Sequence, residues 1–167
     1  MRDSVQGHSV SAWVREVFRS GTVAALVMIP FGLAFRALGL RVNEYGMAVI
    51  RALFGAWPAG VRFALFAIEH FVIAWIAAVP LLLALRLAPR RASQLLLGAL
   101  YGAGFYVAIN SLALPWLFGD PTPWQLGFEV VAPSLVLHLA YGLSIAVTAR
   151  GFVNSRTPAP AHRNARA

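Results

Sequence analysis

Polar side chains that could carry chemistry interrupt three otherwise apolar segments of this chain. His138 lies in the middle of "APSLVLHLAYGLSIAVTAR", and His70 follows Glu69 in an earlier segment. Ionisable groups inside an apolar segment are costly and mark candidate functional positions. An imidazole that titrates near about pH 6.5, with a hydroxyl or carboxylate within reach, can bind or relay a proton. The candidate polar interior comprises Glu69, His70, Tyr106, Asn110, Ser134, His138 and Tyr141.

Helical spacing places several of these groups on shared faces. On one face of the last apolar segment, at i, i+4, i+7, i+8 and i+11, lie Ser134, His138, Tyr141, Gly142 and Ile145. Tyr106 and Asn110 are also four residues apart, and Asn110 lies nearer a span end than either histidine does. Glu69 points about 100° away from His70 around the helix, so the two need not share a partner.

The two histidines support three alternative hypotheses. If their spans start at the same face, a rise of 1.5 Å per residue puts both imidazoles roughly 13 to 17 Å deep. One hypothesis is proton sensing or relay. A second is haem ligation by His70 and His138 from facing helices, which needs two histidines at one depth. The third is a purely structural role, in which each neutral imidazole makes a hydrogen bond between helices.

Known catalytic motifs are missing from the sequence. It contains no G-x-S-x-G, no H-E-x-x-H, no phosphate-binding loop and no close carboxylate pair in an apolar segment. Ser111 and Ser134 have no arranged base and acid beside them. There is no cysteine, which excludes thiol catalysis and thiolate metal sites. We therefore predict a non-enzymatic protein without catalytic residues, metal ligands or a required cofactor.

The elements that must position these groups are predicted to be transmembrane helices. Hydrophobic residues make up 59% of the 167 residues and charged residues 12%, and the mean hydropathy is +0.70. A helix needs about 20 apolar residues to cross a hydrocarbon core of about 30 Å. The fold class is therefore all-α, a four-helix transmembrane bundle in one domain, 1–150, with a disordered cytoplasmic tail, 151–167. The predicted spans are 20–38, 61–85, 94–114 and 127–149.

Charge indicates how the bundle lies in the membrane. All 14 basic residues are arginines, against six carboxylates, and they gather at span ends and in the tails. That distribution favours the lipid bilayer, rather than nucleic acid, as the partner. Arginines precede the first span, separate the second from the third and follow the fourth, so the positive-inside rule puts both termini in the cytoplasm of a bacterial inner (plasma) membrane. We expect the first helix to stay uncleaved.

The connections between spans have their own predicted roles. The first carries Arg41 and Arg51 although it must lie outside, so we interpret segment 41–60 as interfacial or re-entrant. Trp57, Trp116 and Trp124 are expected to anchor at the headgroup level. The third span contains a small-residue face at which another helix can approach closely, formed by Gly98, Ala99, Gly102 and Ala103.

Part of the sequence resembles a known family. The blocks "IEHF", "QLLLGALYGAGFYVAINSLALPWLFGDPTPWQLGFE" and "HLAYGLSIAVTARGF", between residues 68 and 152, resemble the YagU-type family of small bacterial inner-membrane proteins. The family has no established molecular activity and is associated with acid resistance. The resemblance implies that His70 and His138 are the residues to carry over. The connection between the first two spans is shorter here than the family's long outer loop.

The functional prediction is a non-enzymatic inner-membrane protein whose polar, histidine-containing interior is linked to acid stress or proton sensing. A subunit of an oligomeric transporter or channel is one alternative. A structural partner in a larger membrane complex, docking through the small-residue face, is another.

Overall fold

The computed structural model describes residues 9–42, 45–55, 57–89 and 92–155, and within these ranges all regular structure is helical. Four helical segments are long and apolar enough to cross a membrane, as predicted. The first two are α1 (Val10–Ala37) and α3 (Ala59–Leu87). The third, Gln94–Phe118, joins α4 (Gln94–Phe105), the π-helix η1 (Tyr106–Ala113) and α5 (Leu114–Phe118). The fourth is α7 (Phe128–Thr148).

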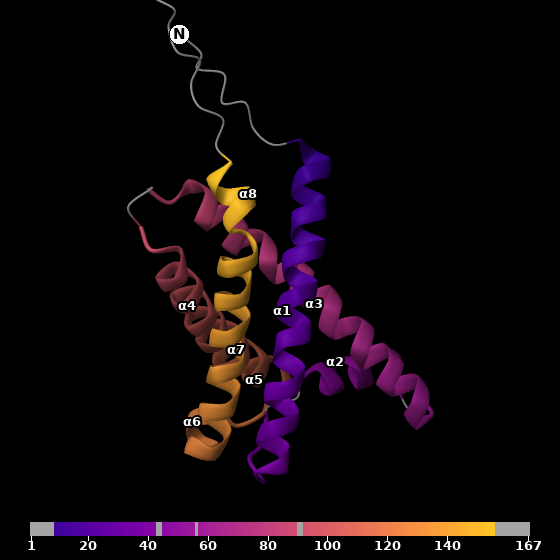
Figure 1. Ribbon diagram of the computed structural model, residues 1–167. Helices are drawn as coiled ribbons and strands as arrows, with labels where there is room; N and C mark the ends of the chain where they lie inside the picture. The colour runs from indigo at the N-terminus through magenta and orange to yellow at the C-terminus, as the bar shows by residue number, and fades with distance from the viewer. Residues whose placement is uncertain (1–8, 43–44, 56, 90–91, 156–167) are drawn as a thin grey trace, which may run out of the picture.

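Three short helices complete the structure. They are α2 (Tyr45–Phe54), α6 (Pro123–Leu126) and α8 (Arg150–Asn154). The four long segments alternate in direction, so the start of α1, the junction of α3 with α4, and α8 lie at one end of the molecule (Figure 1). We call this the terminal end. The predicted tail begins as helix, because α8 continues from α7 as far as Asn154, and the rest of 151–167 lies largely outside the described residues.

The first helix begins ten residues before the predicted span. Ser9 caps it by accepting a hydrogen bond from the Ala12 N–H through its side chain at 3.3 Å. Hydropathy detects only the apolar part of such a helix, whereas the capping residue marks its true start. The third span also continues past the predicted end at 114, because Pro115 lies inside the helical segment rather than ending it.

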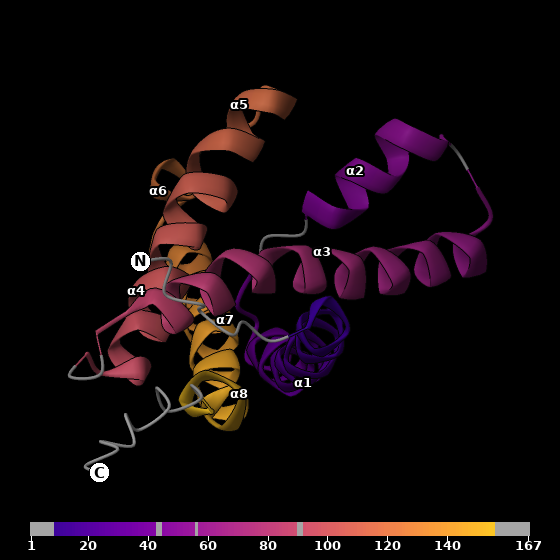
Figure 2. The same ribbon diagram turned by 90° about the horizontal axis from the view of Figure 1, so that it is seen from above.

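Helix α3 is too long to stand upright in a bilayer. Its 29 residues extend about 43 Å at 1.5 Å per residue, against a core of about 30 Å. Figure 2 shows α1 and α7 nearly end-on while α3 runs sideways across them with α2 alongside its first half. The segment predicted as interfacial or re-entrant thus forms α2, whose Tyr45 stacks on Phe118 of α5 with ring centroids 6.0 Å apart.

The core forms where α1, the second half of α3 and α7 meet. Alanines at 24, 25, 74, 77 and 78 let the backbones approach, and Leu81, Leu82 and Leu85 fill the space toward the terminal end. Gly21 of α1 lies so near α3 that an added Cβ would come within 2.9 Å of the Trp75 ring. Trp75 donates its indole N–H to Thr22 at 3.0 Å, which fixes this crossing.

Glycines bring α4 and α7 into direct backbone contact. An added Cβ at Gly98 would lie 2.5 Å from the Gly142 carbonyl oxygen, and one at Gly102 would overlap the His138 carbonyl. Gly142 is equally tight against Gly98. Small residues are the usual way for membrane helices to pack this closely. The small-residue face predicted from the sequence therefore lies, at Gly98 and Gly102, against the chain's own α7.

We predict that Gly102→Ala destabilises the protein and that Gly104→Ala, two residues away, does not. The new methyl group at 102 meets fixed backbone, and overpacking of this kind costs about 1–3 kcal/mol. A Cβ at Gly104 meets nothing within 4 Å, and a helical Gly→Ala change gains up to about 1 kcal/mol. Thermal unfolding in detergent measures both, and equal losses in the two variants would contradict the close contact.

Candidate functional site

A π-helix occupies the middle of the third span. Eight residues, Tyr106–Ala113, adopt this rare form, and Leu114 closes it by donating its N–H to the Ile109 carbonyl five residues back. Pro115 has no backbone N–H to donate, so the α-helical pattern of backbone hydrogen bonds is interrupted at that position. π-Helical turns are rare and frequently lie at functional sites. This one faces the fourth span at the position of a histidine.

His138 lies against the start of η1. Its imidazole packs on Tyr106, with ring centroids 5.4 Å apart, and on Phe105 at 5.8 Å. Its Nδ1 is 2.6 Å from the Ser134 carbonyl oxygen. A carbonyl can only accept, so Nδ1 carries the hydrogen and Nε2 carries the free lone pair. The atom available to take up a proton is therefore Nε2.

Two hydroxyls in η1 are fully enclosed. Tyr106 and Ser111 are both 0% exposed, and neither hydroxyl has a hydrogen-bond partner among the described residues. The Tyr106 ring also meets Trp124 edge-on at 5.9 Å. Asn110 and Ser134, which the sequence assigned to the interior, are buried as well. Five of the seven predicted interior residues thus lie in η1 or α7: Tyr106, Asn110, Ser134, His138 and Tyr141. Ser111 is a further buried polar residue of η1, and the rings of Tyr106 and His138 meet between the two helices.

His70 lies in different surroundings. Its Nε2 donates to the Ala25 carbonyl of α1 at 3.2 Å, and its ring lies near Phe66 and Phe71 of its own helix. The described contacts of His70 are therefore with α1, and those of His138 are with α4 and η1. Haem ligation would require the two imidazoles to face one another, and none of these contacts brings them together.

Glu69 faces α2 rather than a histidine. Its Oε2 would come within 2.6 Å of a Cβ added at Gly46, so the absence of a side chain there lets α2 pack over the carboxylate. Oε1 is buried, and no described residue hydrogen-bonds to it. Adjacent residues on a helix point about 100° apart. This explains why Glu69 and His70 contact different helices.

Tyrosines of α4 and α7 donate hydrogen bonds to backbone carbonyls near the centre of α3. Tyr141 donates its hydroxyl to the Ala74 carbonyl, and Tyr101 donates to Ala77, each at 2.6 Å. Pro80 lies a few residues further along α3 and perturbs its ladder, because it removes one N–H. Tyr141 is thus a buried interior residue, as predicted, with a structural bond. Tyr101 was not predicted from the sequence, because its separation from Tyr141 along the chain does not indicate that both hydroxyls bond to α3.

Arginines hold the terminal end. Arg19 pairs with the buried Glu16 through two hydrogen bonds, of 2.7 and 3.0 Å, and also donates to the Thr148 carbonyl in α7. Arg86 donates to the Phe152 carbonyl in α8 at 3.0 Å. Cations at a helix C-terminus satisfy its last carbonyls and oppose its negative dipole end. Sequence analysis assigned arginines 19 and 86 to topology alone and missed these bonds.

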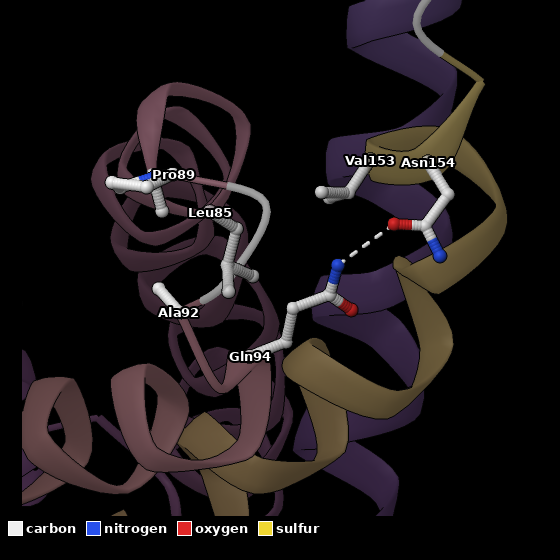
Figure 3. A pocket seen from close by; sticks show the side chains of 7 residues that line it. Leu85, Pro89, Ala92, Gln94, Val153 and Asn154 are labelled. Carbon is white, nitrogen blue, oxygen red and sulfur yellow. Dashed lines mark hydrogen bonds between the residues drawn. The ribbon is translucent and has the colours of Figure 1, made fainter.

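A shallow hollow of about 280 Å³ lies at the same end (Figure 3). Gln94 of α4 points across it and donates to the Asn154 side chain at 2.9 Å. The remaining lining is mostly apolar, from the end of α3 and from Val153. This arrangement joins α4 to α8, and the lining residues that the structure describes carry no charge.

The remaining predicted residues lie as follows. Ala99 and Ala103 are half-buried in α4, beside the two glycines of the close contact. Trp57, Trp116 and Trp124 are exposed, by 49%, 86% and 51%, as a ring at the lipid headgroups would be. Within the described ranges, no three His, Asp or Glu side chains gather as metal ligands would.

Comparison with protein-family models, with curated proteins and with solved structures finds no match to this chain.

We predict that Tyr141→Phe lowers the free energy of unfolding by about 0.5–1.5 kcal/mol, the usual worth of one hydrogen bond. The ring and its packing remain, and only the bond to the Ala74 carbonyl is lost. Unfolding in detergent measures the change. An unchanged free energy would show that the hydroxyl contributes nothing to the attachment of α7 to α3.

Proposed function

We propose that this chain is a non-enzymatic, multi-pass protein of the bacterial inner membrane that responds to acid through protonation of His138. The observation that carries the proposal is the free Nε2 of His138, in an imidazole that packs on the ring of Tyr106, a π-helix residue with an enclosed hydroxyl. An imidazole is the side chain whose charge changes most readily between about pH 5 and 8.

Protonation would alter a tightly constrained contact. From α4 and η1, the groups that pack on the imidazole are the rings of Phe105 and Tyr106, and neither carries a charge at neutral pH. Tyr101 of α4 uses its hydroxyl elsewhere. Neither Glu69 nor Glu129 forms an ion pair with His138 in the part of the chain that the structure describes. The groups that would stabilise the new charge are the Ser134 carbonyl, which already accepts from Nδ1, and the faces of the two rings.

The position of His138 would couple its protonation to a movement of the surrounding helices. Its own backbone carbonyl is the atom that an added Cβ at Gly102 would overlap, so the imidazole projects from the closest part of the α4–α7 contact. Packed interfaces respond to a small local change by moving between discrete arrangements. A charge at this point would shift α7 against η1, and the shift would reach α3 through Tyr141.

The resemblance of residues 68–152 to the YagU-type family supports the same proposal. That family is associated with acid resistance, and the histidines at 70 and 138 are the positions that the resemblance selects. The surroundings of the two differ, and we assign the pH response to His138 because its imidazole packs on Tyr106, a residue of the π-helix with an enclosed hydroxyl.

We further propose that the terminal end lies in the cytoplasm, since it carries Arg15 and Arg19 of α1, Arg86 of α3 and Arg150 of α8. The chain has no cysteine, so single cysteines report position cleanly. Cysteines replacing Ser9 and Ser155 are expected to react with a membrane-impermeant maleimide only after the cells are opened. One replacing Asp120 is expected to react in intact cells. The reverse pattern would invert the orientation.

The functional test is survival after acid shock in a deletion strain that carries wild type, His138→Phe or His70→Phe. Phenylalanine keeps a ring of similar size and removes the titrating nitrogen. We expect lost survival for His138→Phe and wild-type survival for His70→Phe, with equal amounts of each protein in the membrane. Full survival of His138→Phe at an unchanged protein level would contradict the proposal and leave His138 as a packing residue.

A further inference from the structure

The two enclosed hydroxyls of η1 need a partner that the described side chains do not provide. Burying a hydroxyl without a hydrogen bond is costly, and the large majority of buried polar side-chain atoms in proteins have a partner in protein or in ordered water. Tyr106 and Ser111 are both 0% exposed, and neither is hydrogen-bonded in the described structure. Two such hydroxyls in one π-helix indicate that both hydrogen-bond to the same bound polar molecule.

The π-helical register explains why the two oxygens lie together. Tyr106 and Ser111 are five residues apart, the spacing that one π-helical turn brings into line. In the described structure, no hydrogen bond that meets the geometric criteria joins the two hydroxyls. An α-helix would rotate Ser111 away from Tyr106. The π form is therefore what creates the pair.

We propose that η1 binds a buried water molecule, hydrogen-bonded to the hydroxyls of Tyr106 and Ser111, and that this water delivers the proton to His138. The first part stands on the structure of η1, and the second rests on the proposed function. In the delivery step a hydronium at this position gives one proton to Nε2, which leaves neutral water and an imidazolium. The Tyr106 ring, whose centroid lies 5.4 Å from that of the imidazole, carries one of the two hydroxyls and connects the proposed site to His138.

Water fits this site better than a metal ion. The two oxygens are neutral, each can donate and accept, and a buried water usually has two to four polar partners. A hard cation prefers several oxygens and usually a carboxylate. No cluster of metal-ligating side chains is present in the described ranges.

The first test is the sign of the change in Tm for Tyr106→Phe and Ser111→Ala in the full chain, reconstituted in nanodiscs. If the hydroxyls hold a water, each variant loses hydrogen bonds and its Tm falls. If the hydroxyls are unsatisfied, removing one relieves a penalty and the Tm rises or stays constant, which would overturn the proposal. Tyr101→Phe is the matched control, because it loses a known hydrogen bond and its Tm must fall.

The second test separates bound water from a direct bond between the hydroxyls. In water-edited solid-state NMR of the labelled full chain, we expect magnetisation from water at the Tyr106 ring and at the His138 imidazole. The signal should disappear in Ser111→Ala and persist in Tyr101→Phe. No transfer in wild type would overturn the water site.

The same samples test the water site and the protonation of His138 separately. A pH titration of the His138 ¹⁵N signals, assigned by their loss in His138→Phe, tests protonation independently of water. Water contact with no titration would contradict the delivery step and the proposed function while the water site stands. Titration without water contact would overturn the water site and leave the proposed function in place.

Discussion

The close contact between α4 and α7 is the constraint on which the rest of the structure depends. Gly98, Gly102 and Gly142 place no side chain of their own at the crossing, so the backbones of the two helices meet there. The residues that flank the crossing are thereby fixed, His138 on one helix and the start of η1 on the other. In a bilayer, apolar surface gives little reason for helices to associate, so close packing and polar bonds must hold the bundle.

Backbone carbonyls are the main acceptors for the polar side chains in this bundle. Tyr101, Tyr141 and His70 each donate to a carbonyl of a neighbouring helix, and His138 and Thr148 donate to carbonyls of their own helix. Hydrocarbon offers no other acceptor, so each donor needs one within the protein. Against this pattern the hydroxyls of Tyr106 and Ser111 stand out, because the π-helix encloses both without such a partner.

The two ends of the bundle are stabilised in different ways. At the terminal end Arg19 and Arg86 reach carbonyls of α7 and α8, and Glu16 is buried because Arg19 pairs with it. At the opposite end α2 and the start of α3 run sideways (Figure 2), and α2 contacts α5 through the stacked rings of Tyr45 and Phe118. The most closely packed part of the molecule is the crossing of α1, α4, α7 and the second half of α3.

The sequence by itself determined the class of protein, the number of spans and some of the buried polar positions, but not those of Glu16, Ser20 and Ser111. Long apolar runs have one common solution in a bilayer, and a period of 3.6 residues sets which positions share a face of an α-helix, as with Ser134 and Tyr141 in α7. Only the tertiary structure decided which groups meet. It put His70 against α1 and His138 against η1, turned Tyr141 to a carbonyl of α3, and paired Tyr106 with Ser111 through a π-helix. Those outcomes depend on helix rotation, tilt and crossing distance, which arise from contacts between segments far apart in the chain and leave no local pattern in the sequence.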